Sequence, residues 1–439
     1  MEDADQERSG SLVVDGNTLV AMCLAHAGVD RMFGVVGIPV TSLANRDVAL
    51  GVRVIDWSVA GRPGGTYLDL PTDVLYQTIS ESEAERLIIQ AGAAYARAEN
   101  ALRKLVESTG IPILPIPMGK GLLSDDHQLA ATAARSMAIG KCDVALVVGA
   151  WLNWLLHFGE PPKWSKDVKF ILVDIYKDEI ELRKPTLGIL GDAKDVLEKL
   201  HKEINDGPFC LGKTHLWVEA IKNKVKENVA KMEVQLANEV MPFNFLTPMK
   251  IIRDAILGMG SPAPILVSEG ANTMDVGRSV LVQIELRTRL DVGTWGTMGV
   301  GLGYCIAAVV ASPDRLVVAV EGDSGFGFSA MEVEVLVRYQ LPMVVVVFNN
   351  GGVYGGERRN PDEITGPYKD DPAPTSFVPG WRSILVLLEA FGGKGYLAGT
   401  PDELKTTLAE SFSARRPTVI NVTIDPYAGV ESGRLHHKN

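Results

Sequence analysis

The chain has 439 residues, of which 46% are hydrophobic and 22% are charged, and its formal net charge is −11 at pH 7. This length corresponds to roughly two or three ordinary domains, and the composition excludes a disordered or fibrous protein. The acidic balance argues against nonspecific nucleic-acid binding, which depends on a basic surface, so no nucleic-acid partner is expected.

Targeting signals are weak in this sequence. No apolar run reaches the roughly 18 residues that a membrane helix needs, and residues 1–10 are polar, unlike a secretory signal. We therefore expect a soluble cytoplasmic protein without a membrane partner. A peroxisomal location is the alternative, although His437-Lys438-Asn439 is not the Ser-Lys-Leu import signal. The four cysteines form no C-x-x-C pair, which indicates reduced, structural thiols.

Short β-branched and aliphatic runs alternate with longer helical patterns along the chain. This alternation is typical of βαβ units, so we predict an α/β fold with parallel sheets flanked by helices. The predicted segments are an N-terminal region at 11–79, a second α/β region at 80–205, a linker helix at 206–239, the largest α/β region at 240–430 and a tail at 431–439.

Individual elements follow from hydrophobic pattern and helix-stop signals. An Ala- and Glu-rich pattern predicts a helix over 80–108, which Gly110 caps and Pro112 ends. A charged pattern predicts the surface linker helix over 217–239, and a further helix is predicted over 329–340. Strands are predicted at 33–37, 143–149, 168–174, 316–320, 342–348 and 417–424.

The densest chemical signal follows two of these strands. Asp323 lies in a Gly-Asp-Ser-Gly turn, and Asn350 lies in an Asn-Asn-Gly-Gly turn one βαβ unit later. Both side chains should emerge at the carboxyl edge of the sheet, where oxygen ligands suit Mg²⁺ and glycines admit a diphosphate. Either turn alone is typical of an ordinary loop, but the pair favours a metal–diphosphate site. No P-loop or dinucleotide-binding pattern is present.

These two turns resemble the signature of thiamine-diphosphate enzymes. Further segments narrow the resemblance to the family of 2-hydroxyacyl-CoA lyases and oxalyl-CoA decarboxylases, and the resemblance covers most of the chain. It implies a three-region α/β architecture for thiamine diphosphate. The segments that carry it are Gly322-Asp323 to Asn349-Asn350, Phe33-Gly34-Val35-Val36-Gly37-Ile38-Pro39, Gly293-Thr294-Trp295-Gly296-Thr297-Met298-Gly299, Ala390-Phe391-Gly392-Gly393-Lys394-Gly395-Tyr396 and Ala428-Gly429-Val430-Glu431-Ser432-Gly433-Arg434.

The resemblance implies thiamine diphosphate and Mg²⁺ as cofactors. In the family, a carboxylate, an amide and a backbone carbonyl hold the metal, and these match Asp323, Asn350 and Gly352. The residues that match cofactor contacts are Asn272, Met298, Gly322, Asp323, Ser324, Gly325, Asn350 and Gly352.

Several of these matches have a plainer alternative. Met298 matches a bulky side chain that holds the cofactor bent, but methionine also fills cores, and Asn272 is also typical of a turn. Ser432 and Arg434 match a segment that closes over the substrate, which makes them candidate catalytic residues, while a solvated tail is equally compatible.

The second region resembles the family's central domain, which binds nucleotides, including the coenzyme A moiety. Asp174 and Asp192 follow strands there and match ribose or adenine contacts, although acids at strand ends are also ordinary turn residues. Trp151 stands where the family pattern has an arginine, which weakens the phosphate contact expected at that position.

The first region departs from the family. The family's first domain supplies a glutamate that activates the cofactor, but no glutamate lies between Glu7 and Glu81, and Asp47 and Asp56 stand in no copy of the motif. Residues 11–79 are fewer than the roughly 100–150 of a usual domain, so this first domain is predicted to be truncated. An incomplete gene model, a splice form and a diverged subunit all remain open.

The resemblance implies cleavage of 2-hydroxyacyl-CoA to formyl-CoA and an aldehyde, decarboxylation of oxalyl-CoA to formyl-CoA, or both. The substrate is thus an acyl-CoA, and a homo-oligomer, either dimer or tetramer, is expected by analogy. The alternative is a non-catalytic subunit that binds Mg²⁺–thiamine diphosphate and associates with intact subunits. A flavin-containing synthase of the same superfamily is disfavoured by the tail at 431–434.

Overall fold

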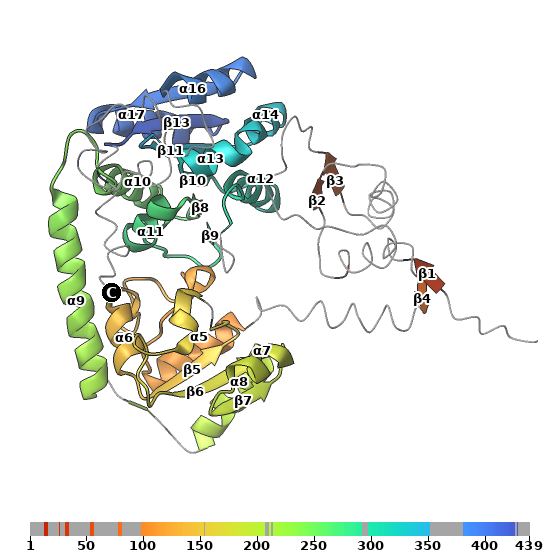
Figure 1. Cartoon of the computed structure of the whole chain (residues 1–439), viewed down its shortest axis with the longest axis vertical. Coiled ribbons are helices and arrows are strands. Elements are labelled where there is room, and N and C mark those ends of the chain that lie inside the picture. The colour runs from red at the N-terminus through yellow and green to blue at the C-terminus, as the bar shows by residue number, and fades with distance from the viewer. Residues whose placement is uncertain are drawn as a thin grey trace, which may run out of the picture. The chain divides into compact units, whose positions relative to one another are not determined.

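The computed structural model describes most of the chain after residue 97. The chain divides into two compact units, one comprising Met1–Ala60 with Tyr67–Ala94 and the other comprising Gly61–Thr66 with Tyr95–Asn439. The described residues, drawn in colour in Figure 1, are 13–15, 26, 31–34, 53–56, 78–80, 98–152, 154–206, 210–211, 214–291, 297–351, 381–425 and 428.

The described part of the first unit consists mainly of four short strands. β1 (Val13–Asp15) pairs antiparallel with β4 (Thr78–Ser80), and β2 (Arg31–Gly34) pairs parallel with β3 (Arg53–Asp56). β2 overlaps the strand predicted at 33–37, whose last three residues lie outside the described ones. The prediction of a truncated first domain falls largely on residues outside the description.

The second unit begins with a three-stranded parallel sheet in the order β5-β6-β7. β5 and β6 confirm the strands predicted at 143–149 and 168–174. The elements of this region are α5 (Glu99–Thr109), α6 (Arg135–Lys141), β5 (Val144–Val148), β6 (Lys169–Asp174), α7 (Lys177–Arg183), β7 (Leu187–Leu190) and α8 (Ala193–Asp206), with 3₁₀ turns η3 (Pro117–Gly119), η4 (Thr132–Ala134) and η5 (Trp154–Gly159).

The prediction of one helix over 80–108 is wrong at its start. Ser80 ends strand β4, residues 81–97 lie outside the described residues, and α5 begins at Glu99. Leu105 of α5 packs against the buried Leu197 of α8. Helices of this length depend on tertiary packing more than on propensity, so Ala and Glu content alone placed the start too early. The end is as predicted, because Gly110 adopts the left-handed conformation (φ 69°) and its N–H donates to Val106.

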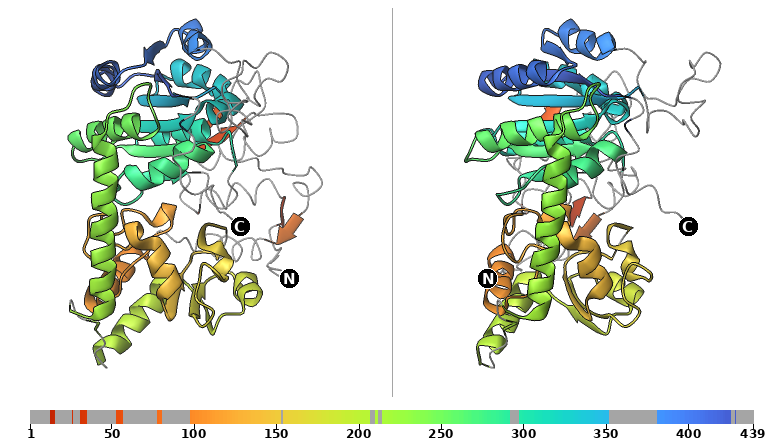
Figure 2. Two further views of the ribbon diagram at one scale, coloured as in Figure 1. Left: turned by 60° about the vertical axis from the view of Figure 1, so that its left-hand side comes forward. Right: turned by 90° about the vertical axis from the view of Figure 1, so that its left-hand side faces the viewer.

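A long helix, α9 (Leu216–Ala237), confirms the helix predicted at 217–239. Ile221 packs with residues of η4, and Asn228 Nδ2 donates to the Ala133 carbonyl oxygen at 2.7 Å. Near its end, Leu236 joins the core of the larger sheet. Figures 1 and 2 show α9 running beside the region of the smaller sheet and the region of the larger sheet. None of the described helices combines the length and apolar character needed to cross a membrane.

The larger sheet has six parallel strands in the order β12-β13-β11-β10-β8-β9. Its central strands are fully buried, since residues 317–320 and 343–348 have no exposed surface. The elements are α10 (Leu246–Gly258), β8 (Ile265–Glu269), α11 (Ala271–Val280), β9 (Arg289–Asp291), α12 (Gly301–Ala311), β10 (Val317–Gly322), α13 (Asp323–Ser329), η6 (Ala330–Glu332), α14 (Val333–Arg338), β11 (Met343–Asn349), α16 (Trp381–Ala390), β12 (Lys394–Ala398), α17 (Pro401–Ala414) and β13 (Thr418–Thr423).

Helices cover both faces of this sheet, as Figure 2 shows. One face packs against α9, α10, α11 and α17, and its core includes Val318, Val344 and Ile420. Glu269 and Glu321 lie on the opposite side, where they meet the start of α12. The predicted α/β class with parallel sheets flanked by helices is confirmed for the described residues.

The direction in which the chain adds strands to the sheet reverses between β8 and β10, which makes this place a topological switch point. The chain leaves β8 toward β9 on one side and then returns to β10 on the other side. In open α/β sheets, ligands bind in the crevice outside the carboxyl ends of the strands at such a point. The turns after β8 and β10 therefore border the expected ligand site.

Candidate active site

The turns after β8 and β10 approach each other closely. Gly270 follows β8 with a positive φ of 88°, which favours glycine, and a Cβ atom added there would lie 3.1 Å from the backbone nitrogen of Gly322. The two strand ends thus meet without side chains between them. The close approach of the two backbones depends on glycine at position 270.

The two turns predicted from the sequence also meet. The Asp323 carboxylate accepts from the Gly351 N–H at 2.9 Å through Oδ2, and from the Ser324 N–H at 2.6 Å through Oδ1. Asn350 stands beside Gly351 and is buried, with 7% of its surface exposed. The structure therefore brings Asp323 and Asn350 to one edge of the sheet, while Gly352 lies outside the described residues.

This arrangement fits the group that the sequence implies. Gly351 has a positive φ of 83°, and no heavy atom of the described residues lies within 4 Å of the position that a Cβ would occupy there. Carboxylate and amide oxygens suit Mg²⁺, which completes its shell with ligand phosphates. The described residues contain no cluster of three His, Cys, Asp or Glu side chains, so this site resembles no all-protein metal cage.

The helix after the Gly-Asp-Ser-Gly turn starts earlier than predicted. The sequence analysis placed a helix at 329–340, but α13 begins at Asp323 itself and continues through η6 into α14. Glycines at 325 and 327 disfavour a helix. The fully buried Phe326 anchors this turn in the core and overrides that preference. Ser324 and Gly325 consequently lie in the first turn of α13.

The other predicted residues are placed as follows. Gly322 ends β10, and Asn272 lies in the first turn of α11 with 7% of its surface exposed. Met298 is half-buried in the turn that leads into α12. Ser432 and Arg434 lie outside the described residues, as do residues 292–296 of the segment before Met298.

The sequence analysis missed a pair of buried carboxyl groups. Glu269 and Glu321 are neighbours in register on β8 and β10, and neither has exposed surface. Glu269 accepts hydrogen bonds from the N–H groups of Gly299 and Gly301, whereas neither oxygen of Glu321 has a hydrogen-bond partner among the described residues. The sequence signal that could have identified this pair is a glutamate at, or one residue before, the end of each of two strands.

Burial sets the protonation of this pair. Loss of solvation and the nearby Glu269 raise the pKa of Glu321 well above its ordinary value. Burial also raises the pKa of Glu269, but its backbone donors oppose that change. Glu269 is therefore the member of the pair whose negative charge the protein stabilises.

Glu332 of η6 provides a pH-dependent test of this region. Burial and then the charge of Glu334 raise its pKa from 4.5 to about 7. Between these values the unfolded chain has lost the proton that the folded chain keeps, so stability falls as pH rises. We expect Glu332→Gln to be more stable than wild type by about 3 kcal/mol at pH 8 and nearly equal to it at pH 4, below both pKa values, measured by urea unfolding. Equal differences at both pH values would contradict this assignment.

In the smaller sheet, the two candidate acids serve local structure. Asp174 Oδ1 accepts from the Tyr176 N–H at 2.8 Å, and Asp192 Oδ1 accepts from the Lys194 N–H at 2.8 Å at the start of α8. The turn interpretation therefore accounts for both side chains. Trp151 stacks on Tyr176 with ring centroids 6.1 Å apart, and both rings are exposed at the carboxyl edge of the sheet.

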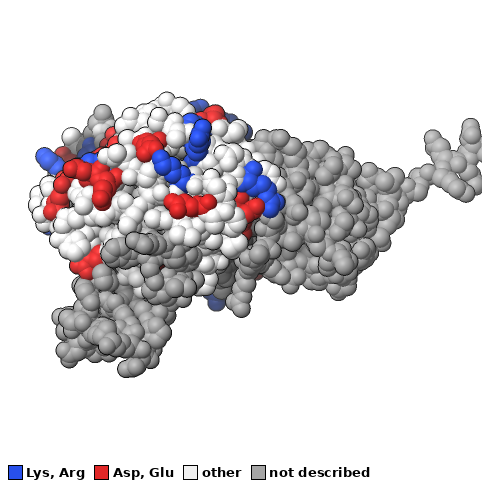
Figure 3. All heavy atoms as spheres, turned by 90° about the horizontal axis from the view of Figure 1, so that it is seen from above, with Lys and Arg blue, Asp and Glu red and all other residues white. Residues whose placement is uncertain are grey.

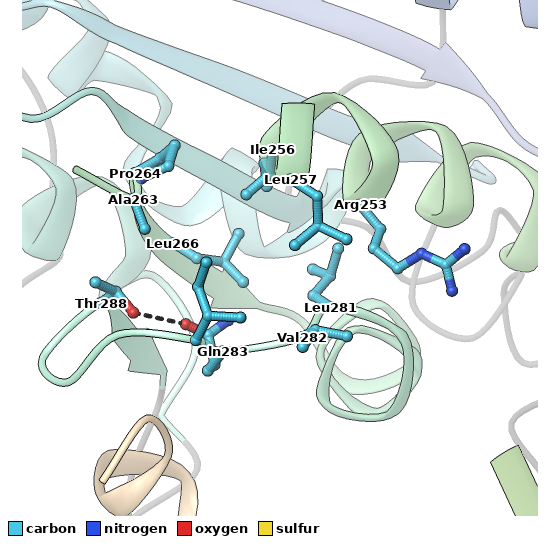
Figure 4. Close-up of a pocket in the computed structure, with 11 residues that line it drawn as sticks. Arg253, Ile256, Leu257, Ala263, Pro264, Leu266, Leu281, Val282, Gln283 and Thr288 are labelled. Atoms are coloured by element: carbon cyan, nitrogen blue, oxygen red, sulfur yellow. Dashed lines mark hydrogen bonds between the residues drawn. The ribbon is translucent and has the colours of Figure 1, made fainter. Parts of the chain in front are cut away.

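A separate apolar pocket lies between α10, the end of α11 and the start of β9 (Figure 4). Two of its lining residues are hydrogen-bonded, since Thr288 Oγ1 donates to Gln283 Oε1 at 2.9 Å. Its lining includes none of the predicted site residues. The residues that line it are Arg253, Ile256, Leu257, Ala263, Pro264, Leu266, Leu281, Val282, Gln283, Ile284 and Thr288.

Charges are mixed on the described surface shown in Figure 3. Basic and acidic side chains lie interspersed on this face rather than gathered by sign. Several pair locally, such as Lys394 with Glu410 and Arg338 with Glu334. The described part of this face therefore carries no patch of a single charge sign.

Comparison with known proteins gives consistent matches. Residues 73–200 match the family described as thiamine pyrophosphate enzyme, central domain, and residues 270–422 match the C-terminal TPP binding domain. The chain is 55% identical to a 2-hydroxyacyl-CoA lyase of Arabidopsis thaliana, with 99% of this chain and 100% of that protein covered. It is 39% identical to oxalyl-CoA decarboxylase of Escherichia coli K12, covering 90% and 74% of the two chains.

A human relative extends the comparison. The chain is 38% identical to human 2-hydroxyacyl-CoA lyase 1, with 88% of this chain and 72% of that protein covered. The alignment with the Arabidopsis protein extends over 572 positions, more than the 439 residues present here. Parts of that relative therefore have no counterpart in this chain.

Proposed function

Because the chain belongs to the thiamine-pyrophosphate-dependent family of 2-hydroxyacyl-CoA lyases and oxalyl-CoA decarboxylases, we propose that it uses Mg²⁺ and thiamine diphosphate to release formyl-CoA. The substrate is a 2-hydroxyacyl-CoA, oxalyl-CoA, or both. The observation that supports this proposal most directly is the hydrogen bond from the Gly351 N–H to Asp323, which joins the two signature turns at the carboxyl ends of β10 and β11.

The chain's own residues have separable roles in this proposal. Asp323 and Asn350 would hold Mg²⁺, and the turns after β10 and β11 that carry them would face the diphosphate. Met298 contacts the organic part of the cofactor. When bound, the thiazolium ring accepts the electron pair of the carbon–carbon bond that breaks. Ser432 and Arg434 close over the acyl-CoA.

A non-catalytic subunit is the second candidate. Residues 8–80 contain no glutamate, and the alignment with the Arabidopsis lyase requires positions that this chain lacks. Such a chain would bind Mg²⁺–thiamine diphosphate through Asp323 and Asn350 and associate with intact subunits. Under either candidate we propose a cytoplasmic homo-oligomer or mixed oligomer, with a peroxisomal location as the alternative.

Formyl-CoA formation distinguishes the two candidates. The purified chain, with thiamine diphosphate and Mg²⁺, is offered oxalyl-CoA and a 2-hydroxyacyl-CoA separately, and we expect formyl-CoA from at least one of them. Asp323→Asn keeps the side-chain shape without the charge and serves as the control that should abolish the product. Cofactor binding without product would favour the non-catalytic subunit. Failure to bind the cofactor at all would refute both candidates.

A further inference from the structure

Glu269 lies where three segments of the candidate site converge. It is the last residue of β8 and accepts from the N–H groups of Gly299 and Gly301, in the turn that carries Met298 into α12. Its own backbone continues through Gly270 into α11. One carboxylate thereby connects two segments that border the cofactor.

The packing around this carboxylate extends to the third segment. A Cβ atom added to Gly325, in the turn after Asp323, would lie 3.1 Å from Glu269 Oε1. A Cβ added to Gly301 would lie 2.5 Å from Glu269 Oε2. Because both positions are glycine, the Glu269 carboxylate fits between the turn that carries Met298 and the turn that follows β10.

The hydrogen bonds to Glu269 favour its charged form and oppose the effect of burial. Removing a carboxylate from water is costly unless hydrogen bonds and dipoles compensate it. Here two backbone N–H groups and the positive end of the 11-residue helix α12 face the carboxylate. A glutamine in this place would turn its own NH₂ group toward one of these N–H donors, which breaks a charge-assisted hydrogen bond.

We propose that Glu269 is a positioning residue that holds the Gly299–Gly301 turn, and Met298 with it, against the organic part of thiamine diphosphate. Glu269 acts through the backbone and does not touch the cofactor itself. This inference rests on the proposed function, because it needs the cofactor to bind beside Met298.

Two variants test the inference. Glu269→Gln removes the charge at the acceptor of the two N–H groups, and Glu321→Gln is the matched control, because Glu321 is equally buried but accepts no hydrogen bond. The affinities for thiamine diphosphate and for inorganic pyrophosphate are measured by calorimetry with Mg²⁺. Amide hydrogen exchange of residues 297–301 is measured in the cofactor-free chain.

We expect Glu269→Gln to lower thiamine diphosphate affinity at least 10-fold, while pyrophosphate affinity stays within about 3-fold, because Asp323 and Gly351 keep their contacts. Exchange at 297–301 should rise in the same variant. Glu321→Gln should change each quantity by less than about 3-fold. If Glu269→Gln does not fold, Glu269→Asp, which withdraws the carboxylate by one methylene, should show the same split.

Three results would overturn the inference. Glu269→Gln could behave like Glu321→Gln in both exchange and thiamine diphosphate affinity. It could lose both ligands equally, which indicates a general structural role. Finally, the wild-type chain could fail to bind thiamine diphosphate, and the proposed function would then fail as well. If the wild-type chain binds the cofactor normally and Glu269→Gln is unaffected, only the positioning role of Glu269 is refuted.

Discussion

Replacing Asp323 with alanine is expected to weaken Mg²⁺-dependent binding of thiamine diphosphate by about 1000-fold, which corresponds to about 4 kcal/mol. The variant loses the charged metal ligand and also the acceptor that ties the Gly351 N–H to the start of α13. Both losses weaken the same candidate cofactor site, at the carboxyl ends of β10 and β11. Calorimetric titration of the cofactor in the presence of Mg²⁺ measures the change directly.

A matched control separates this effect from a general change in charge. Asp314→Ala removes an exposed aspartate between α12 and β10 and should leave cofactor affinity unchanged. Chelating Mg²⁺ should weaken binding by the wild-type chain but have little further effect on Asp323→Ala, because both changes remove the same contact. Additive effects of chelation and substitution would show that the metal lies elsewhere.

The sequence predicted the framework of this site well because buried parallel strands form nearly continuous apolar runs. The strands predicted at 316–320 and 342–348 are present as β10 and β11, displaced by one or two residues. Since neighbouring parallel strands end at one edge of the sheet, the meeting of Asp323 with the Gly351 turn followed from strand order alone.

Features that depend on packing across the sheet were not predictable in this way. The early start of α13 depends on burial of Phe326, which outweighs two glycines. The pairing of Glu269 with Glu321 depends on the register of β8 and β10, and no local pattern encodes this register. Both errors concern the side of the site that faces α12.

Substituting Gly301 with alanine is expected to destabilise the larger region by about 3 kcal/mol, with a fall in Tm of roughly 8 °C. The added Cβ would collide with the carboxyl groups of Glu269 and Glu321, which are held by neighbouring strands and have no exposed surface into which to move. Because Gly301 starts α12, the collision must displace either the helix or a strand end.

The exposed Gly258, at the end of α10, is the matched control for this substitution. No heavy atom lies within 4 Å of a Cβ added there, so Gly258→Ala should be neutral or stabilising by up to about 1 kcal/mol, since alanine favours a helix. Thermal unfolding of both variants without cofactor gives the comparison. Equal stability of the two variants would mean that the buried carboxyl pair does not pack against α12, and the positioning role of Glu269 would lose its structural basis.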